Sequence, residues 1–130
     1  MAGRNPAPQN IVTPTATTAD TRARMIGRNV RQVSVAAVTN DADDWITLPS
    51  LNTVPVGHTI RILCNAGGNF ELRPPASSAE EINSEDCDGT KEYLCTDTQV
   101  ITIIKINNTI GWDAYAHSAI GAAVTAVVPD

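Results

Sequence analysis

The feature that most constrains the fold is a pair of short strand-like runs separated by a glycine turn. The runs, Thr59–Cys64 and Asn69–Arg73, flank the tetrapeptide Asn65-Ala66-Gly67-Gly68. In the second run, apolar and charged residues alternate, which is the period-two pattern of a strand with one buried face. The glycines supply the positive φ that a tight connection needs. This pattern predicts a β-hairpin over these residues.

Further strand-like runs lie on both sides of this hairpin, separated by turn residues. They are residues 33–37, Trp45–Leu48, Lys91–Cys95, Val100–Ile106 and Ile110–Ala116. Lys91–Cys95 and Val100–Ile106 are expected to form the last hairpin. Val100–Ile106 is β-branched almost throughout, and its near-continuous apolar character predicts burial on both faces, either in the centre of a sandwich or at a subunit contact. We therefore predict an all-β fold, a small antiparallel β-sandwich or jelly roll.

Composition and length favour one modest domain. The chain has 130 residues, of which 42% are hydrophobic and only 4% aromatic, so an aliphatic core is expected. Residues 1–24 contain Pro6, Pro8 and Pro14 and are rich in Thr, Ala, Asn and Arg, a composition that cannot bury a core. We expect residues 1–29 to form an extended arm and residues 30–130 to form the β-sandwich or jelly-roll body.

The charges are distributed unevenly between these parts. Residues 1–31 hold five arginines against one aspartate, a net charge of +4, whereas the rest holds four basic residues against 13 acidic ones, a net charge of −9. Five arginines without a lysine favour bidentate contacts with an acidic partner over mere solvation of the arm. Between the arginines, Met25 and Ile26 form a small apolar segment that could anchor on the same partner. The expected binding residues are Arg4, Arg22, Arg24, Met25, Ile26, Arg28 and Arg31.

No catalytic or metal-binding pattern is recognisable, and we expect neither an enzyme nor a cofactor. The three cysteines have no CxxC spacing; Cys64 is expected to be buried, and a Cys87–Cys95 disulfide is the less favoured alternative. His58 and His117 lack partners at metal-ligand spacing. Asp86-Cys87-Asp88-Gly89 resembles the middle of a calcium loop but fails at both of its ends.

The sequence also argues against catalysis by paired carboxylates, nucleic-acid binding and membrane insertion. Glu80-Glu81 and Glu85-Asp86 lie in a polar stretch without an aromatic platform, so solvated acids are favoured over a glycosidase pair. The acidic body has few aromatic residues for base stacking, so a protein partner is favoured over nucleic acid. No apolar run is long enough to span a bilayer, and the polar start predicts retention in a cytoplasm.

The order of motifs in the body resembles a module of tailed-bacteriophage virion proteins. The matching residues are Ile46-Thr47-Leu48-Pro49, then Val54-Pro55-Val56-Gly57 with Ile60, then the strand Val100–Ile106, then Gly111-Trp112. The resemblance covers about residues 45–116. It implies a small β-sandwich or jelly roll that trimerises, as in capsid decoration (cement) proteins and in head or tail fibres.

A short single domain with an arm fits a decoration protein better than a fibre. The resemblance then implies a homotrimer on the outer surface of a virion assembled in a host bacterial cytoplasm, with the major capsid protein as partner and no small-molecule substrate. Expected trimer contacts are Ile101, Ile103, Trp112, Ile120 and Val124. The alternative is a receptor- or carbohydrate-binding domain of a phage fibre, with Pro74–Gly89 as its recognition loop.

Overall fold

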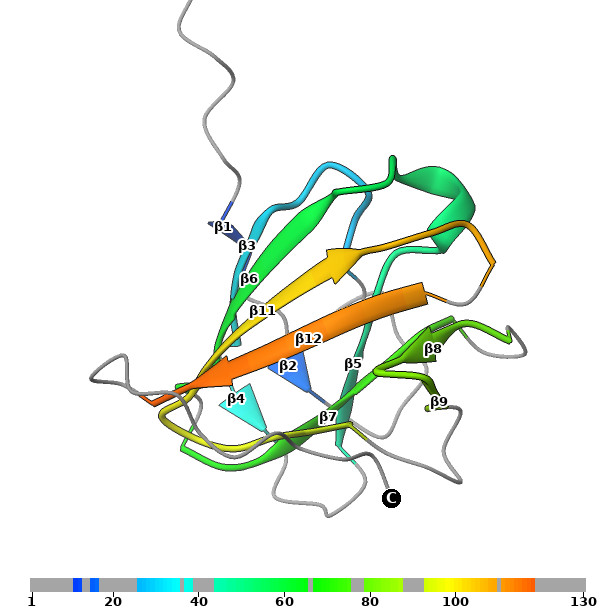
Figure 1. Ribbon diagram of the computed structural model, residues 1–130. Coiled ribbons are helices and arrows are strands. Elements are labelled where there is room, and N and C mark those ends of the chain that lie inside the picture. Colours follow the sequence, from blue (N-terminus) through cyan, green and yellow to red (C-terminus); the bar gives the residue numbers. More distant parts are fainter. Residues whose placement is uncertain are drawn as a thin grey trace, which may run out of the picture.

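The regular secondary structure of the described residues is almost entirely β-strand (Figure 1). The computed structural model describes residues 11–12, 15–16, 26–35, 37–38, 44–65, 67–75, 79–87, 93–109 and 111–118. The strands are β1 (Ile11–Val12), β2 (Thr15–Ala16), β3 (Gln32–Ser34), β4 (Ala37–Val38), β5 (Trp45–Thr47), β6 (Thr59–Leu63), β7 (Phe70–Arg73), β8 (Glu81–Ile82), β9 (Glu85–Asp86), β10 (Tyr93–Cys95), β11 (Val100–Lys105) and β12 (Gly111–His117). The 3-10 turn η2 (Leu51–Thr53) precedes β6. The prediction of an all-β fold is confirmed.

Two sheets enclose the core, and a third, small sheet pairs β2 with β4. The larger sheet has the order β1-β3-β6-β11-β12-β8-β9, and the smaller has the order β10-β7-β5. Strand β11 pairs with β6 and β12 in antiparallel fashion. Strands β3 and β6, β5 and β7, and β8 and β12 are parallel pairs. The sheets are therefore mixed, and the prediction of a purely antiparallel arrangement was wrong, because the chain changes sheet between strands and returns in the same direction.

Both predicted hairpins were also wrong, although their strands exist. Strand β6 lies in the larger sheet and β7 in the smaller, and the same holds for β11 and β10. Both edges of β6 are already occupied, by β3 and β11, so β7 has no free edge on which to pair. The polypeptide after β6 stays attached to the β11 side, since the Cys64 N–H donates to the Gln99 carbonyl at 2.9 Å. It then crosses to the other layer.

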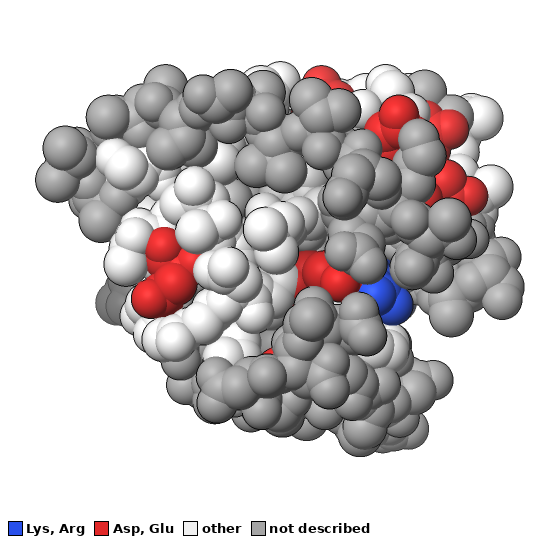
Figure 2. All heavy atoms as spheres, turned by 90° about the horizontal axis from the view of Figure 1, so that it is seen from below, with Lys and Arg blue, Asp and Glu red and all other residues white. Residues whose placement is uncertain are grey.

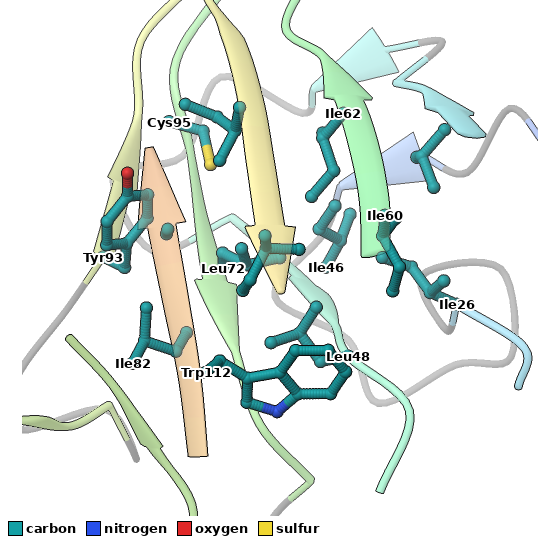
Figure 3. Close-up of a cluster of buried hydrophobic side chains, with 14 of the residues drawn as sticks. Ile26, Ile46, Leu48, Ile60, Ile62, Leu72, Ile82, Tyr93, Cys95 and Trp112 are labelled. Atoms are coloured by element: carbon teal, nitrogen blue, oxygen red, sulfur yellow. The ribbon is translucent and has the colours of Figure 1, made fainter. Parts of the chain in front are cut away.

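The core lies between the two sheets and is mainly aliphatic (Figure 3). Ile60 and Ile62 of β6 point inward from the larger sheet, and Leu72 of β7 and Tyr93 of β10 point inward from the smaller one. These four side chains are at most 1% exposed. Full burial of such a side chain contributes about 1.5–3 kcal/mol. Alternating strand residues thus supply the apolar area that stabilises the fold.

The strongest strand, β11, has one buried and one open face. Ile101, Ile103 and Lys105 are buried, whereas Val100, Thr102 and Ile104 are half-buried. Burial of both faces in the centre of a sandwich was therefore a wrong expectation, whereas the alternative, burial at a subunit contact, stays a prediction. The larger sheet packs on the core with only one side, so every second β11 side chain points away from it.

The polar stretch after Pro74 contributes to the larger sheet. It contains β8 and β9, joined through Asn83 and Ser84, which have φ angles of 52° and 67°. The Asn83 side chain accepts from the Ala114 N–H at 2.8 Å and donates to the Ala114 carbonyl at 3.2 Å, so it binds β12. Gly111, with φ of 156°, has no substitute there, because a Cβ would lie 2.2 Å from the Glu81 carbonyl oxygen.

Candidate functional site

The structure divides the predicted arm residues into three groups. Arg4, Arg22, Arg24 and Met25 lie outside the described residues. Ile26 is 2% exposed and belongs to the core of this chain, so it is not available to fill a pocket on a partner. Its assignment to a partner-binding segment was wrong, because an isoleucine this close to the sheet gains more from the chain's own core. Arg28 and Arg31 are exposed.

Backbone hydrogen bonds fix the segment that carries the two exposed arginines. The Ile26 N–H donates to the Thr47 carbonyl at 2.9 Å, and the Val30 N–H donates to the Gly27 carbonyl at 3.0 Å, which closes a turn. Val30 is 7% exposed and joins the core. Arg28 therefore projects from a turn that is anchored on both sides. We refer to Arg28 and Arg31 together as the basic corner.

The basic corner extends to a buried histidine. His58 is 3% exposed, and burial, together with the nearby charges of Arg31 and Lys105, lowers its pKa. A hydrogen bond with the Val30 backbone acts in the opposite direction. The imidazole is consequently neutral at pH 7, and the positive charge of this region comes from the arginines and Lys105. A neutral, enclosed imidazole has a structural role here.

Lys105 is 1% exposed, and its ammonium group is bound by the oxygens of neutral carbonyl and amide groups. Its Nζ donates to the Leu51 carbonyl, to the Val54 carbonyl at 2.5 Å and to Asn108 Oδ1 at 2.6 Å. This group, which we name the Lys105 clamp, ties η2 and the loop after it to the end of β11. The three donors of the ammonium group have three acceptors, so the buried charge is satisfied by dipoles.

The smaller sheet carries a second buried charged group. Glu71 is fully buried, and Arg73 forms an ion pair with it in which Arg73 Nε donates to Glu71 Oε2 at 2.5 Å. The Arg73 guanidinium carbon lies 4.3 Å from the centroid of the Trp45 ring, which is a cation–π contact. We name this group the Glu71–Arg73 pair. It fixes β7 against β5 on the side away from Phe70 and Leu72.

The acids considered as a catalytic pair have structural roles as well. Glu80 Oε1 accepts from the Leu51 N–H at 2.9 Å and from Ser50 Oγ at 3.2 Å, which places it at the start of η2. Glu81 lies in β8, paired with Gly111, and Glu85 lies in β9. Each acid thus belongs to a different local structure.

The three thiols are buried in the core. Cys64, Cys87 and Cys95 are free, and each is at most 1% exposed. Burial and a hydrogen bond with Cys64 raise the pKa of Cys95, and burial next to the three thiols raises the pKa of Tyr93. A thiol with a raised pKa is a poor nucleophile. In the described ranges, no three His, Cys, Asp or Glu side chains gather closely enough to hold a metal ion.

Three of the five expected trimer contacts lie in the interior. Ile101 and Ile103 are fully buried and Trp112 is 1% exposed, all within the core of one chain, so these contacts were assigned to the wrong side of the sheet. The physical reason is the period of a strand, because a shift by one residue exchanges the two faces. Ile120 and Val124 lie outside the described residues.

The described charges on one face of the body are mostly acidic (Figure 2). Figure 2 shows scattered groups of Asp and Glu atoms on one face, whereas Lys and Arg atoms occupy one small area. None of the helices in the described part is long and apolar enough to cross a membrane.

Sequence reasoning did not identify the Lys105 clamp or the Glu71–Arg73 pair. A signal for the clamp exists, since strict alternation from Ile101 and Ile103 places Lys105 on the same, inward face. For Glu71 the alternation with Phe70 and Leu72 indicates the solvent side, and only the rest of the fold buries it.

No family model matches the sequence, and searches of curated proteins and of solved structures give no match.

Proposed function

We propose that this chain is a structural virion protein that decorates the outer surface of a tailed-bacteriophage capsid. Its basic N-terminal segment and the basic corner bind acidic surface on the major capsid protein, and the body, a small jelly roll, bridges neighbouring capsid subunits as a homotrimer. The observation that carries the proposal is the basic corner, because Arg28 and Arg31 are exposed on an anchored turn directly after a segment with three further arginines.

The chemistry of this arrangement suits attachment to a protein. Arginine binds carboxylates with two parallel hydrogen bonds, and such charge-assisted pairs are about twice as strong as neutral ones. Several arms on one oligomer raise the local concentration of binding groups, so individually weak contacts give tight attachment.

Attachment can be tested with purified, undecorated tailed-phage heads. The full chain and a variant with Arg4, Arg22, Arg24, Arg28 and Arg31 all changed to Gln are sedimented with the heads, and binding is measured as the amount in the pellet. Substitution is preferable to deletion of residues 1–31, because such a deletion would also remove the core residues Ile26 and Val30. We expect the glutamine variant to lose binding at least about 100-fold and the wild type to weaken as salt is raised.

A matched variant with lysine at the same five positions keeps the charge and removes the bidentate geometry. The amount of this lysine variant that sediments with the heads should lie between the amounts of the wild type and of the glutamine variant. If the glutamine variant sediments with the heads as well as the wild type does, the attachment mechanism is wrong. Binding of the wild type to a glycan array, without binding to heads, would instead support the fibre-type carbohydrate-binding alternative.

A further inference from the structure

The outer face of the larger sheet differs from an ordinary solvated face along its central strand. The outward residues of β11 are Val100, Thr102 and Ile104, and none of them is charged. A sheet that covers the core with one side usually carries polar and charged residues on the other. Here two of three positions on the strand farthest from the sheet edges are aliphatic. Figure 1 shows β6, β11 and β12 side by side in this sheet.

The strands on either side of β11 complete this face with opposite charges. On β6, Arg61 is exposed and lies opposite Thr102. On β12, Tyr115 also lies opposite Thr102, is 52% exposed, and its hydroxyl lies 3.5 Å from Asp113 Oδ2. Arg61 and Tyr115 are thus separated by one strand, at a distance between their strands of roughly 10 Å. We name the outer face of β6, β11 and β12 the outer sheet face.

We propose that the outer sheet face binds the same face of another copy of this chain. In that contact the β6 side of one copy lies on the β12 side of the next, so that Arg61 meets Asp113 and the Tyr115 ring of the partner, and the aliphatic β11 residues are covered. The chain itself carries both halves of this match, on opposite sides of an uncharged strand, which is what self-complementarity requires.

Contact between the β6 side of one copy and the β12 side of the next can form either a dimer with two-fold symmetry or a closed ring of three copies. In both, the charged residues lie at the flanks and Ile104 and Val100 lie nearest the symmetry axis. The ring of three is the homotrimer of the proposed function, and the measured mass of the assembly distinguishes it from a pair. Contacts of this kind also use the strands first expected to hold the subunits together, with the residues shifted by one position to the face that is open.

The test is the mass of the full chain in solution, measured by light scattering and sedimentation equilibrium over a range of concentrations. We expect an oligomer for the wild type. Ile104→Asp should weaken self-association about 100-fold or more. The control is Leu94→Asp, which places the same charge on another exposed apolar residue, 40% exposed on β10 of the smaller sheet. It should leave the mass unchanged.

A charge exchange tests the pairing itself. Arg61→Glu and Asp113→Arg should each weaken association at least about tenfold, and the double variant should restore it, because the two charges then meet in reversed order. These exposed or half-exposed positions keep the test decisive even if Ile104→Asp fails to fold, which circular dichroism would detect.

A monomeric wild type overturns the inference, as does an oligomer that Ile104→Asp leaves intact or that the Leu94 control dissociates. No capsid is present in these measurements. The self-association surface and the proposed capsid attachment therefore succeed or fail separately.

Discussion

The Lys105 clamp and the Glu71–Arg73 pair solve the same problem in different ways. Each holds a charged side chain that is almost or completely buried. The clamp surrounds its ammonium group with two backbone carbonyls and one amide oxygen, whereas the pair sets a guanidinium against a carboxylate and an indole ring. Removal of the cation therefore leaves neutral dipoles in the first case and a buried anion in the second. A buried anion is the more costly remainder.

The largest expected effect in this comparison comes from Arg73→Met. The substitution keeps an apolar side chain over Trp45 but takes the guanidinium from Glu71, which is fully buried. We expect a loss of about 4 kcal/mol in the free energy of unfolding, measured by urea denaturation. Arg73→Lys, which keeps the charge, should lose clearly less. A loss below about 1 kcal/mol for Arg73→Met would show that the carboxylate does not depend on this partner.

Lys105→Met should have the next largest effect. It leaves the Leu51 and Val54 carbonyls without the ammonium group, in a region that excludes water. We expect a loss of about 3 kcal/mol, because each buried acceptor without a donor costs about 1–3 kcal/mol. The control is Ile106→Met on the neighbouring residue, which is 42% exposed and should change stability by less than about 0.5 kcal/mol. Equal effects of the two substitutions would contradict a clamp.

Glu71→Gln should be milder than either substitution of a cation. The amide still accepts from Arg73, and the arginine keeps its contact with Trp45 and 15% of its surface in solvent. We expect a loss of about 2 kcal/mol. Combined with Arg73→Met, the loss should be smaller than the sum of the two single losses, since the two residues interact directly. Simple additivity in this double-mutant cycle would contradict the pair as described.

The smallest expected effect is the dependence of stability on the protonation of His58. Its pKa is lowered in the folded state from the ordinary 6.5, so the unfolded chain binds a proton first as the pH falls. The contribution of neutral His58 to the free energy of unfolding is therefore fully present above about pH 6.5. It declines as the pH falls below that value, by no more than about 1.4 kcal/mol for each unit by which the pKa is lowered. The midpoint of thermal unfolding, followed from about pH 7.5 to about pH 5.5, should fall less steeply in His58→Asn than in the wild type. Parallel curves would exclude His58 as the titrating group.

The local patterns in the sequence were sufficient to predict strands but not their partners. The alternation in Asn69–Arg73 predicted that Phe70 and Leu72 share the inward face, and both are buried. Alternation reports which residues of one strand point the same way, and it carries no information about which strands lie side by side. The sheet order depends on contacts between distant segments, so it could not be predicted in this way.

The candidate site was predictable to a similar extent. The charge asymmetry indicated arginine contacts, and Arg28 and Arg31 are exposed. Ile26 could not be assigned correctly, because its burial depends on a hydrogen bond from its own N–H to Thr47, far along the chain. Alternation indicates the inward position of Lys105 but not its acceptors, since Lys105 meets Leu51 and Val54 only when η2 folds back on β11.

The central position of β11 has a consequence for the order in which the molecule can form. Strand β6 is made early, yet its antiparallel neighbour in the larger sheet is β11, and β7 and β10 in between belong to the other layer. During synthesis on the ribosome, Ile60 and Ile62 must therefore wait until β11 has emerged before they are enclosed. Local pairing is available only to β8 with β9 and to β11 with β12 among the described strands of the larger sheet. Folding should begin at the β11–β12 hairpin and proceed on a timescale of about milliseconds to seconds, as in other proteins dominated by pairing between distant strands.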